Sequence, residues 1–198
     1  MSKQSIYHAL SLLIFSAFLV IPREGMAQER LTEDDLRIRR LESNTVRTPQ
    51  YQVRGSTASG RQGEWLEVRT QFETRPDWID ELTFTYYIVL QNPRPERGQN
   101  PFKLLTGETT YINIEQTRRG QSTVYVHPST VDRFGEVERV GVVISAGGRT
   151  LAMESEPSHE GRWWERLSPQ SGLVYSRDKS PFALVNIDDF EAIKPSDR

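Results

Sequence analysis

The side chains that most often do chemistry in enzymes are scarce in this chain and are not arranged for catalysis. The 198 residues contain three histidines and no cysteine, which excludes a thiolate nucleophile and a zinc site built on thiolates. His159-Glu160 begins like the zinc-protease signature H-E-x-x-H, but Trp163 stands where the second histidine is required. His127, the other histidine outside the N-terminal region, has no metal-ligand spacing to it. The sequence therefore predicts neither a metal centre nor a cofactor.

Serine and carboxylate chemistry is equally poorly supported. Gly120-Gln121-Ser122 lacks the following glycine of a nucleophile elbow and opens an expected strand. The adjacent carboxylates of Asp34-Asp35 and of Asp188-Asp189 would point to opposite faces of a strand, so solvated charge is the better interpretation of both pairs. The sequence also has no phosphate-binding loop and no dinucleotide-binding glycine pattern. We therefore expect a protein that is not an enzyme.

Arginine and aromatic residues are the remaining candidates, and they suit recognition of a partner. Arginine supplies most of the 25 basic residues, and its planar guanidinium pairs specifically with carboxylates at interfaces. Ordinary solvated faces are the alternative for the arginines. The tryptophan pair could form a sugar-stacking platform or could pack against one end of the fold. The predicted partner-binding residues are Arg37, Arg39, Arg40, Arg94, Arg97, Trp163 and Trp164.

Composition and charge narrow the class of protein further. The chain has 25 Lys and Arg against 27 Asp and Glu, a net charge of −2, which argues against a general nucleic-acid binder. With 36% hydrophobic and 10% aromatic residues, it is too apolar to be wholly disordered.

The N-terminus predicts a secretory signal peptide over residues 1–27. Lys3 provides the positive charge, 13 apolar residues follow from Ala9 to Ile21, and Gly25-Met26-Ala27 offers a cleavage site. Those 13 residues would span only about 20 Å as a helix, against a hydrocarbon core of about 30 Å. No second long apolar segment follows, so we expect no integral membrane segment after cleavage. The protein is expected in the periplasm or at the cell surface, associated with the outer membrane.

The rest of the chain predicts an antiparallel β-sandwich at 49–198, preceded by a short N-terminal arm or helix at 28–48. Glu64–Glu73 alternates between apolar and charged residues, and Leu82–Gln91 is apolar on both faces. Asn92–Pro101 is an expected loop, and Phe182–Ile187 an expected strand. Eight or nine short strands with no long helical period are typical of a sandwich.

Three shorter segments are expected to connect the strands. Gln116–Gly120 has the length of a hairpin loop, and Gly147-Gly148 is a two-residue hairpin signal. His127–Gly135 predicts one helical turn that crosses between the sheets. Thr32 is an expected helix N-cap, with Asp35 in the place of the capping-box glutamate.

These elements resemble a family of exported, pilus-associated proteins of verrucomicrobial bacteria that occur with type IV pilus-like components. The residues that carry the resemblance are Trp65 before the alternating strand, the corner Pro76–Leu82 that leads into Tyr86-Tyr87, Tyr125–Ser129 with Arg133-Phe134-Gly135, and the hairpin at Gly147-Gly148. The resemblance covers Tyr51–Asp189 and implies an immunoglobulin-like fold, an envelope location and a non-enzymatic role. It carries no catalytic residues. Unlike true pilins, the chain lacks a prepilin cleavage motif followed by a long assembly helix.

Three functional hypotheses follow. The first is an exported protein-interaction module, an accessory component of a type IV pilus-like or envelope assembly, whose partners are envelope or pilus-like proteins. The alternative is a carbohydrate-binding β-sandwich module or a small glycan-active hydrolase, which requires an exposed Trp163 or Trp164. A third is a structural envelope protein that binds through the arm at 28–48.

Overall fold

The structure, a computed structural model, describes residues 31–50 and 63–195. All of them belong to one compact unit, Leu31–Arg198. The predicted signal peptide at 1–27 lies outside the described residues, as does the segment 51–62. No helix within the described ranges has both the length and the apolar character needed to cross a membrane.

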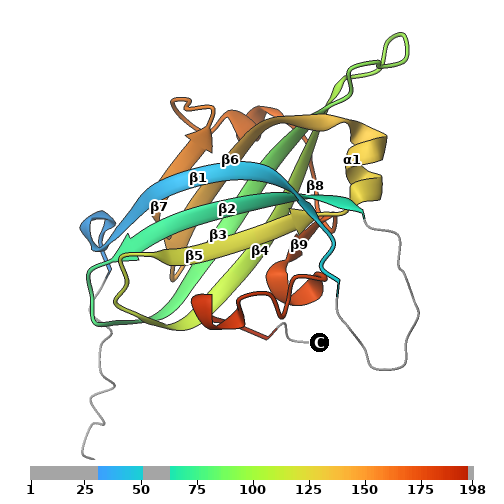
Figure 1. Ribbon diagram of the computed structural model, residues 1–198. Coiled ribbons are helices and arrows are strands. Elements are labelled where there is room, and N and C mark those ends of the chain that lie inside the picture. The colour runs from blue at the N-terminus through green and yellow to red at the C-terminus, as the bar shows by residue number, and fades with distance from the viewer. Residues whose placement is uncertain (1–30, 51–62, 196–198) are drawn as a thin grey trace, which may run out of the picture. The chain divides into compact units, whose positions relative to one another are not determined.

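Two β-sheets pack against each other to form the domain (Figure 1). The four-stranded sheet has the order β1 (Leu36–Arg47), β2 (Glu64–Thr74), β5 (Gly120–Val126), β9 (Val174–Ser176). The six-stranded sheet has the order β10 (Ala192–Ile193), β4 (Phe102–Glu115), β3 (Trp78–Gln91), β6 (Glu136–Ala146), β7 (Arg149–Glu156), with β8 (Pro169–Gln170) beside β4. The helical elements are η1 (Glu33–Asp35), α1 (Pro128–Phe134), η2 (Trp163–Arg166), η3 (Arg177–Lys179) and η4 (Ile187–Asp189).

The strand order is immunoglobulin-like, which confirms the predicted fold class. The first, second and fifth strands share one sheet, and the third, sixth and seventh share the other, as in immunoglobulin sandwiches. The fourth strand pairs with the third instead of joining the first sheet. All neighbouring strands are antiparallel except β8, which runs parallel to β4.

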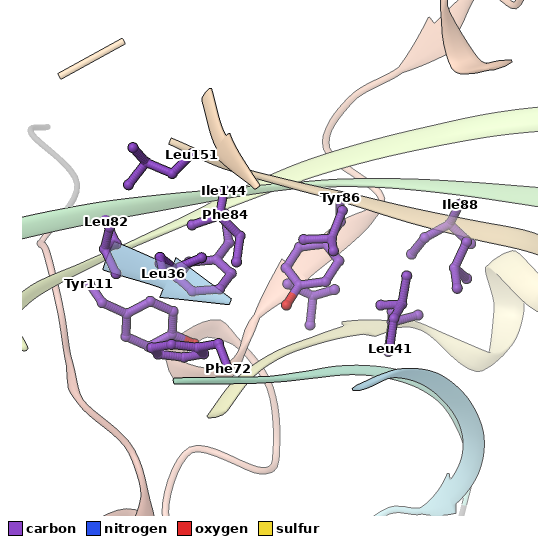
Figure 2. Packing of buried hydrophobic residues seen from close by; sticks show 14 of the residues in the cluster. Leu36, Leu41, Phe72, Leu82, Phe84, Tyr86, Ile88, Tyr111, Ile144 and Leu151 are labelled. Atoms are coloured by element: carbon purple, nitrogen blue, oxygen red, sulfur yellow. The ribbon is translucent and has the colours of Figure 1, made fainter. Parts of the chain in front are cut away.

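Alternation along the strands fills the space between the sheets. On β2 the apolar face predicted from the sequence, including Val68 and Phe72, is fully buried. On β3, Phe84 and Tyr86 point into the same core. Figure 2 shows Phe84 lying close to Tyr111, with Phe72 below it; the ring centroids of Phe84 lie 5.1 Å from Phe72 and 5.4 Å from Tyr111. Aromatic contacts of this kind add to the free energy gained by burying the rings.

One polar group in this core is fully hydrogen-bonded. The Tyr86 hydroxyl lies 3.0 Å from Thr70 Oγ1, 2.9 Å from Ser122 Oγ and 3.1 Å from the Ser122 carbonyl oxygen. Tyr86 is on β3, whereas Thr70 and Ser122 are on the opposite sheet. The hydroxyl therefore links the two sheets while it avoids the penalty of an unpaired buried polar group.

The arm predicted at 28–48 is replaced, from Leu36 on, by a full strand of the sandwich. β1 pairs with β2 along its whole length, and Leu36 and Leu41 are buried in the core. The register shifts between Ile38 and Arg40, because Arg39 is inserted as a bulge. That insertion breaks the period-2 pattern by which a strand is recognised in a sequence.

The short helix expected just before this strand is present. The helix η1 follows Thr32, whose backbone N–H and hydroxyl donate to Asp35 Oδ2 at 2.7 Å and 2.8 Å. These hydrogen bonds hold the pKa of the Asp35 carboxyl below its ordinary value. The capping box predicted from Thr32 and Asp35 is thus confirmed.

Two connections differ from the sequence-based expectation. Gln116–Gly120 is a corner between sheets and not a hairpin, because β4 pairs with β3 while β5 pairs with β2. Phe182–Ile187 is not a strand: it forms turns that end in η4, and only Phe182 is buried. Phe182 packs on the outer face of the four-stranded sheet, and the other large apolar side chains of this segment are exposed.

Two other predicted connections are confirmed. Gly147 and Gly148, both with positive φ, join β6 to β7. The helix α1 crosses from the four-stranded to the six-stranded sheet and ends at Gly135, whose N–H donates to the Val131 carbonyl at 2.8 Å.

Buried tyrosines make a prediction about alkaline pH. Burial raises the pKa of Tyr86, Tyr111 and Tyr125 above the ordinary value of 10.0, and the nearby Glu67 carboxylate adds to the effect at Tyr125. The folded chain thus keeps protons on these tyrosines that the unfolded chain loses, so their effect on stability is constant below about pH 10 and lowers stability as the pH rises further. Ultraviolet titration of tyrosine ionisation, followed together with circular dichroism, should show these three ionising only as the sheets unfold. Reversible ionisation near pH 10 with the strands intact would contradict this.

Candidate partner-binding surface

A groove of about 500 Å³ lies on the outer face of the six-stranded sheet, where β4 begins. Its walls come from two segments that are distant in the sequence: the end of the β3–β4 loop with the start of β4, and the chain between η2 and β8. We call it the β4 groove, and its lining residues are Gln99, Asn100, Phe102, Lys103, Leu104, Arg166, Leu167 and Ser168.

The β3–β4 loop that forms one wall holds itself in place by hydrogen bonds. At its base the Asn92 N–H donates to the Pro101 carbonyl at 2.9 Å. Nearer the groove, the Phe102 N–H donates to Asn100 Oδ1 at 2.9 Å, and Gln99 Nε2 donates to Glu96 Oε2 at 2.6 Å. The loop projects beyond the sheets in Figure 1 as a narrow hairpin. Residues 93–100 of this loop are exposed, and they include Arg94 and Arg97.

The tryptophan pair packs on the outer face of the six-stranded sheet, next to the β4 groove. Trp164 is only 5% exposed and stacks on Tyr87, with ring centroids 4.5 Å apart and planes 7° from parallel. Together with Val89 and Leu104 it forms a small apolar cluster on the outer face of the sheet. Trp163 is half-buried, and its indole N–H donates to Ser155 Oγ at 2.9 Å. Trp164 is therefore structural and cannot serve as a sugar-stacking platform, whereas Trp163 is partly exposed.

Gly141 on β6 makes room for this cluster. A Cβ at that position would lie 2.9 Å from Trp164 Cζ3 and 3.1 Å from Trp163 Cζ2, which is too close for both rings to stay where they are. The absence of a side chain on β6 thus lets both tryptophans lie against the sheet.

Two cations line the β4 groove, and a third lies over the neighbouring Trp163 ring. Lys103 and Arg166 line it, and neither takes part in any of the ion pairs found among the described residues. Lys103 Nζ lies 5.8 Å from the centroid of Phe134, and the Arg139 guanidinium lies 5.7 Å from the Trp163 ring. Phe102 adds an apolar contact, since its ring is 40% exposed. The combination suits a partner segment that carries an apolar side chain next to carboxylates.

The structure divides the predicted site residues into two groups. The end of the β3–β4 loop and the tryptophan pair lie at the outer face that carries the β4 groove, whereas Arg94 and Arg97 are exposed on the projecting part of that loop. The remaining three arginines lie on β1, in the other sheet. Arg39 Nε donates to Glu73 Oε2 at 2.8 Å, and Arg40 pairs with Glu42 at 2.8 Å. Arg37 is exposed and lies beside Glu33, Asp34, Glu73 and Arg75 at a small acidic hollow.

Sequence reasoning missed Phe102, Lys103 and Arg166. Each is a single residue in an unremarkable context, and the two segments that carry them meet only because β8 pairs in parallel with β4, Leu104 opposite Pro169. An aromatic residue directly after a proline-rich loop was the one available signal.

Two other groups of titratable side chains lie away from the groove: Glu67 is engaged by its neighbours, whereas the Asp188-Asp189 pair is exposed. On the outer face of the four-stranded sheet, Glu67 is 5% exposed, pairs with Arg69 at 2.8 Å and accepts from the Tyr125 hydroxyl at 3.2 Å. Asp188 and Asp189 lie in η4, both exposed. Among the described residues, no group of three or more His, Asp or Glu side chains is arranged to hold a metal ion.

The fold and its surface define an immunoglobulin-like β-sandwich protein, and comparison with known proteins agrees. One protein-family model matches residues 27–197, and the chain belongs to the family that this model describes. A crystal structure of a protein from Akkermansia muciniphila has a TM-score of 0.70 and 21% sequence identity, over 82% of this chain and 94% of that chain. The sandwich is thus shared with a protein of the Verrucomicrobia. No curated protein is similar enough to this chain to give a match.

Proposed function

We propose that this chain is an exported, non-enzymatic protein-interaction module, an accessory component of a type IV pilus-like or other envelope assembly. The family match and the fold shared with a verrucomicrobial protein support the resemblance on which this proposal rests. Immunoglobulin-like sandwiches commonly bind partners through loops at one end or through strand edges. The signal peptide predicted at 1–27 supports an envelope location, where such assemblies are built.

The observation that carries the proposal is the β4 groove. It combines an exposed aromatic ring, Phe102, with two cations, Lys103 and Arg166, that have no carboxylate partner among the described residues. The loop beside it is held by its own hydrogen bonds, so little conformational entropy is lost when a partner binds there. The partner segment it fits has an aliphatic or aromatic anchor flanked by acidic residues.

The structure gives less support to the carbohydrate-binding alternative than to an interaction module. It required an exposed tryptophan at 163 or 164, whereas Trp164 is stacked under Tyr87 and Trp163 has its N–H engaged by Ser155. The exposed tryptophan of the described residues is Trp78, at 56%, and it stands at the start of β3, at the opposite end of that strand from the β3–β4 loop.

In-cell crosslinking followed by mass spectrometry tests the proposal. Cells would produce the wild-type chain, a Phe102→Ala/Arg166→Glu variant, or the control variant Arg149→Glu, whose arginine is exposed at the β6–β7 hairpin. We expect crosslinks from the β3–β4 loop to envelope or pilus-like proteins in the wild type and the control, and at least tenfold fewer in the groove variant, as for loss of a central anchor. Equal crosslinking by all three chains would refute a role for the groove.

The same experiment reports the compartment. A mature N-terminus at Gln28 in the envelope fraction is expected if residues 1–27 are a cleaved signal. A full-length chain recovered with cytoplasmic proteins would exclude the proposed envelope role.

A further inference from the structure

A second surface feature has the properties that the β4 groove requires of its partner. In residues 184–189, which we call the C-terminal turn, Leu184 is 67% exposed, Val185 37% and Ile187 54%. Aliphatic side chains clustered at the surface in this way mark interaction sites more often than scattered ones do. Asp188 and Asp189 follow directly and are exposed, and neither takes part in an ion pair with any described residue.

The C-terminal turn is held in a fixed conformation. Phe182, just before it, stacks on Tyr125 with ring centroids 4.3 Å apart. The buried guanidinium of Arg177 donates to the Val185 carbonyl and lies 4.0 Å from the centroid of Phe190, just after the turn. An apolar turn that is fixed before binding loses little entropy when it docks.

The turn and the groove face away from each other within one chain. Phe182 packs with Trp65 and Tyr125 on the outer face of the four-stranded sheet. The β4 groove lies on the outer face of the six-stranded sheet, next to the cluster of Val89 and Trp164. In Figure 1 the C-terminal segment lies beside β9, below β5. The turn of one copy therefore cannot reach its own groove, but it can reach the groove of another copy.

We propose that the C-terminal turn of one copy docks into the β4 groove of a second copy. The aliphatic side chains of the turn, Ile187 foremost, pack against Phe102 of the second copy, and Asp188 and Asp189 pair with Lys103 and Arg166. This inference rests on the groove of the proposed function and names its partner as the same chain. Because the two surfaces differ, the first copy keeps its groove unused and the second keeps its turn unused, so further copies can add head to tail.

Charge reversal in two separate variants gives a direct test with purified mature protein. One variant is Lys103→Glu/Arg166→Glu, the other Asp188→Lys/Asp189→Lys, and the control is Arg149→Glu/Glu160→Lys, which exchanges two exposed charges elsewhere. Sedimentation velocity would be measured from about 10 µM to about 1 mM, the range in which a contact of one turn in one groove is expected to associate. Circular dichroism verifies that each variant is folded.

The wild type and the control are expected to sediment faster as concentration rises, and each charge-reversed variant alone to associate at least tenfold more weakly. Mixing the two variants should restore association, because the acidic groove of one then meets the basic turn of the other. A wild type that stays monomeric throughout, or a mixture that behaves as the sum of its parts, would overturn the proposal.

The failure of this inference can be told apart from the failure of the proposed function. A purified chain that stays monomeric but is crosslinked in cells to another envelope protein through the groove would remove self-docking alone. A chain that self-associates in solution but has no envelope partner and no envelope location would remove the pilus-like or envelope role alone.

Discussion

Replacing Gly135 by alanine is expected to lower the free energy of unfolding by about 3 kcal/mol or more, because this position combines backbone strain with a backbone clash. Gly135 closes α1 with φ +98° and ψ −163°, a region that only glycine adopts without strain. A Cβ built there would lie 1.9 Å from the Gln91 carbonyl oxygen and 2.8 Å from Asn92 Cα. Neither neighbour is a flexible side-chain end, so the crossover between the sheets would have to move.

Urea denaturation would measure the effect, and Gly148→Ala is the matched control. Gly148 also has a positive φ, +78°, but nothing lies within 4 Å of the position its Cβ would take. The control is therefore expected to cost only about 1 kcal/mol. If the two variants were equally stable, the close approach of Gly135 to Gln91 would not be a determinant of the fold.

Phe84→Ala is expected to destabilise the domain by about 4 kcal/mol. Phe84 is fully buried and contacts Phe72 across the sandwich and Tyr111 on the neighbouring strand. Removal of its ring leaves a cavity that β-sheets pinned by ladder hydrogen bonds fill poorly. Since domains of this kind have only about 5–15 kcal/mol of stability in total, the variant should denature at a much lower urea concentration.

Phe102→Ala is the control for that experiment. Phe102 is 40% exposed and lines the β4 groove, so its loss should lower the free energy of unfolding by only about 1 kcal/mol. A stability loss at Phe102 comparable with that at Phe84 would mean that the groove ring is part of the core, and the groove would then lose its exposed anchor.

The sandwich could be predicted because most of its strands obey simple rules. The alternation over Glu64–Glu73 placed Val68 and Phe72 inward correctly, since one face of β2 packs on the core. Strand β1 could not be predicted, because its apolar residues do not keep a regular alternation. It is rich in arginine, and the bulge at Arg39 shifts its apolar positions from one parity to the other.

The last part of the chain could not be predicted from local patterns. Phe182–Ile187 has the composition of a buried strand, yet it pairs with neither sheet. Only Phe182 finds a ring to pack on, Tyr125, and Asn186 adopts a left-handed conformation, φ 49°, that turns the chain. A window of six residues does not show whether the rest of the fold offers that segment a strand to pair with.

The candidate surface was predicted in part. Two of the three proposed segments, the loop at 92–101 and the tryptophan pair, do contribute to one face. The sequence left open whether the tryptophans are exposed or packed, and the structure packs Trp164 against Tyr87. Aromatic residues in a loop do not reveal whether a sheet lies beneath them, and here the space over Gly141 admits both rings. The cations and the exposed ring of the groove meet through the parallel pairing of β8, which has no local sequence signal.

The path of the chain after β9 has a mechanical consequence. The C-terminal segment leaves one sheet at Ser176 and joins the other at β10, where Ala192 and Ile193 face Ile112 and Tyr111 and the Lys194 N–H donates to the Thr110 carbonyl at 2.8 Å. Tension on this end would load that two-residue ladder first and the long ladder of β3 and β4 last. The segment between β9 and β10 would therefore detach from the six-stranded sheet at low force, and the chain would lengthen while the sandwich stays folded.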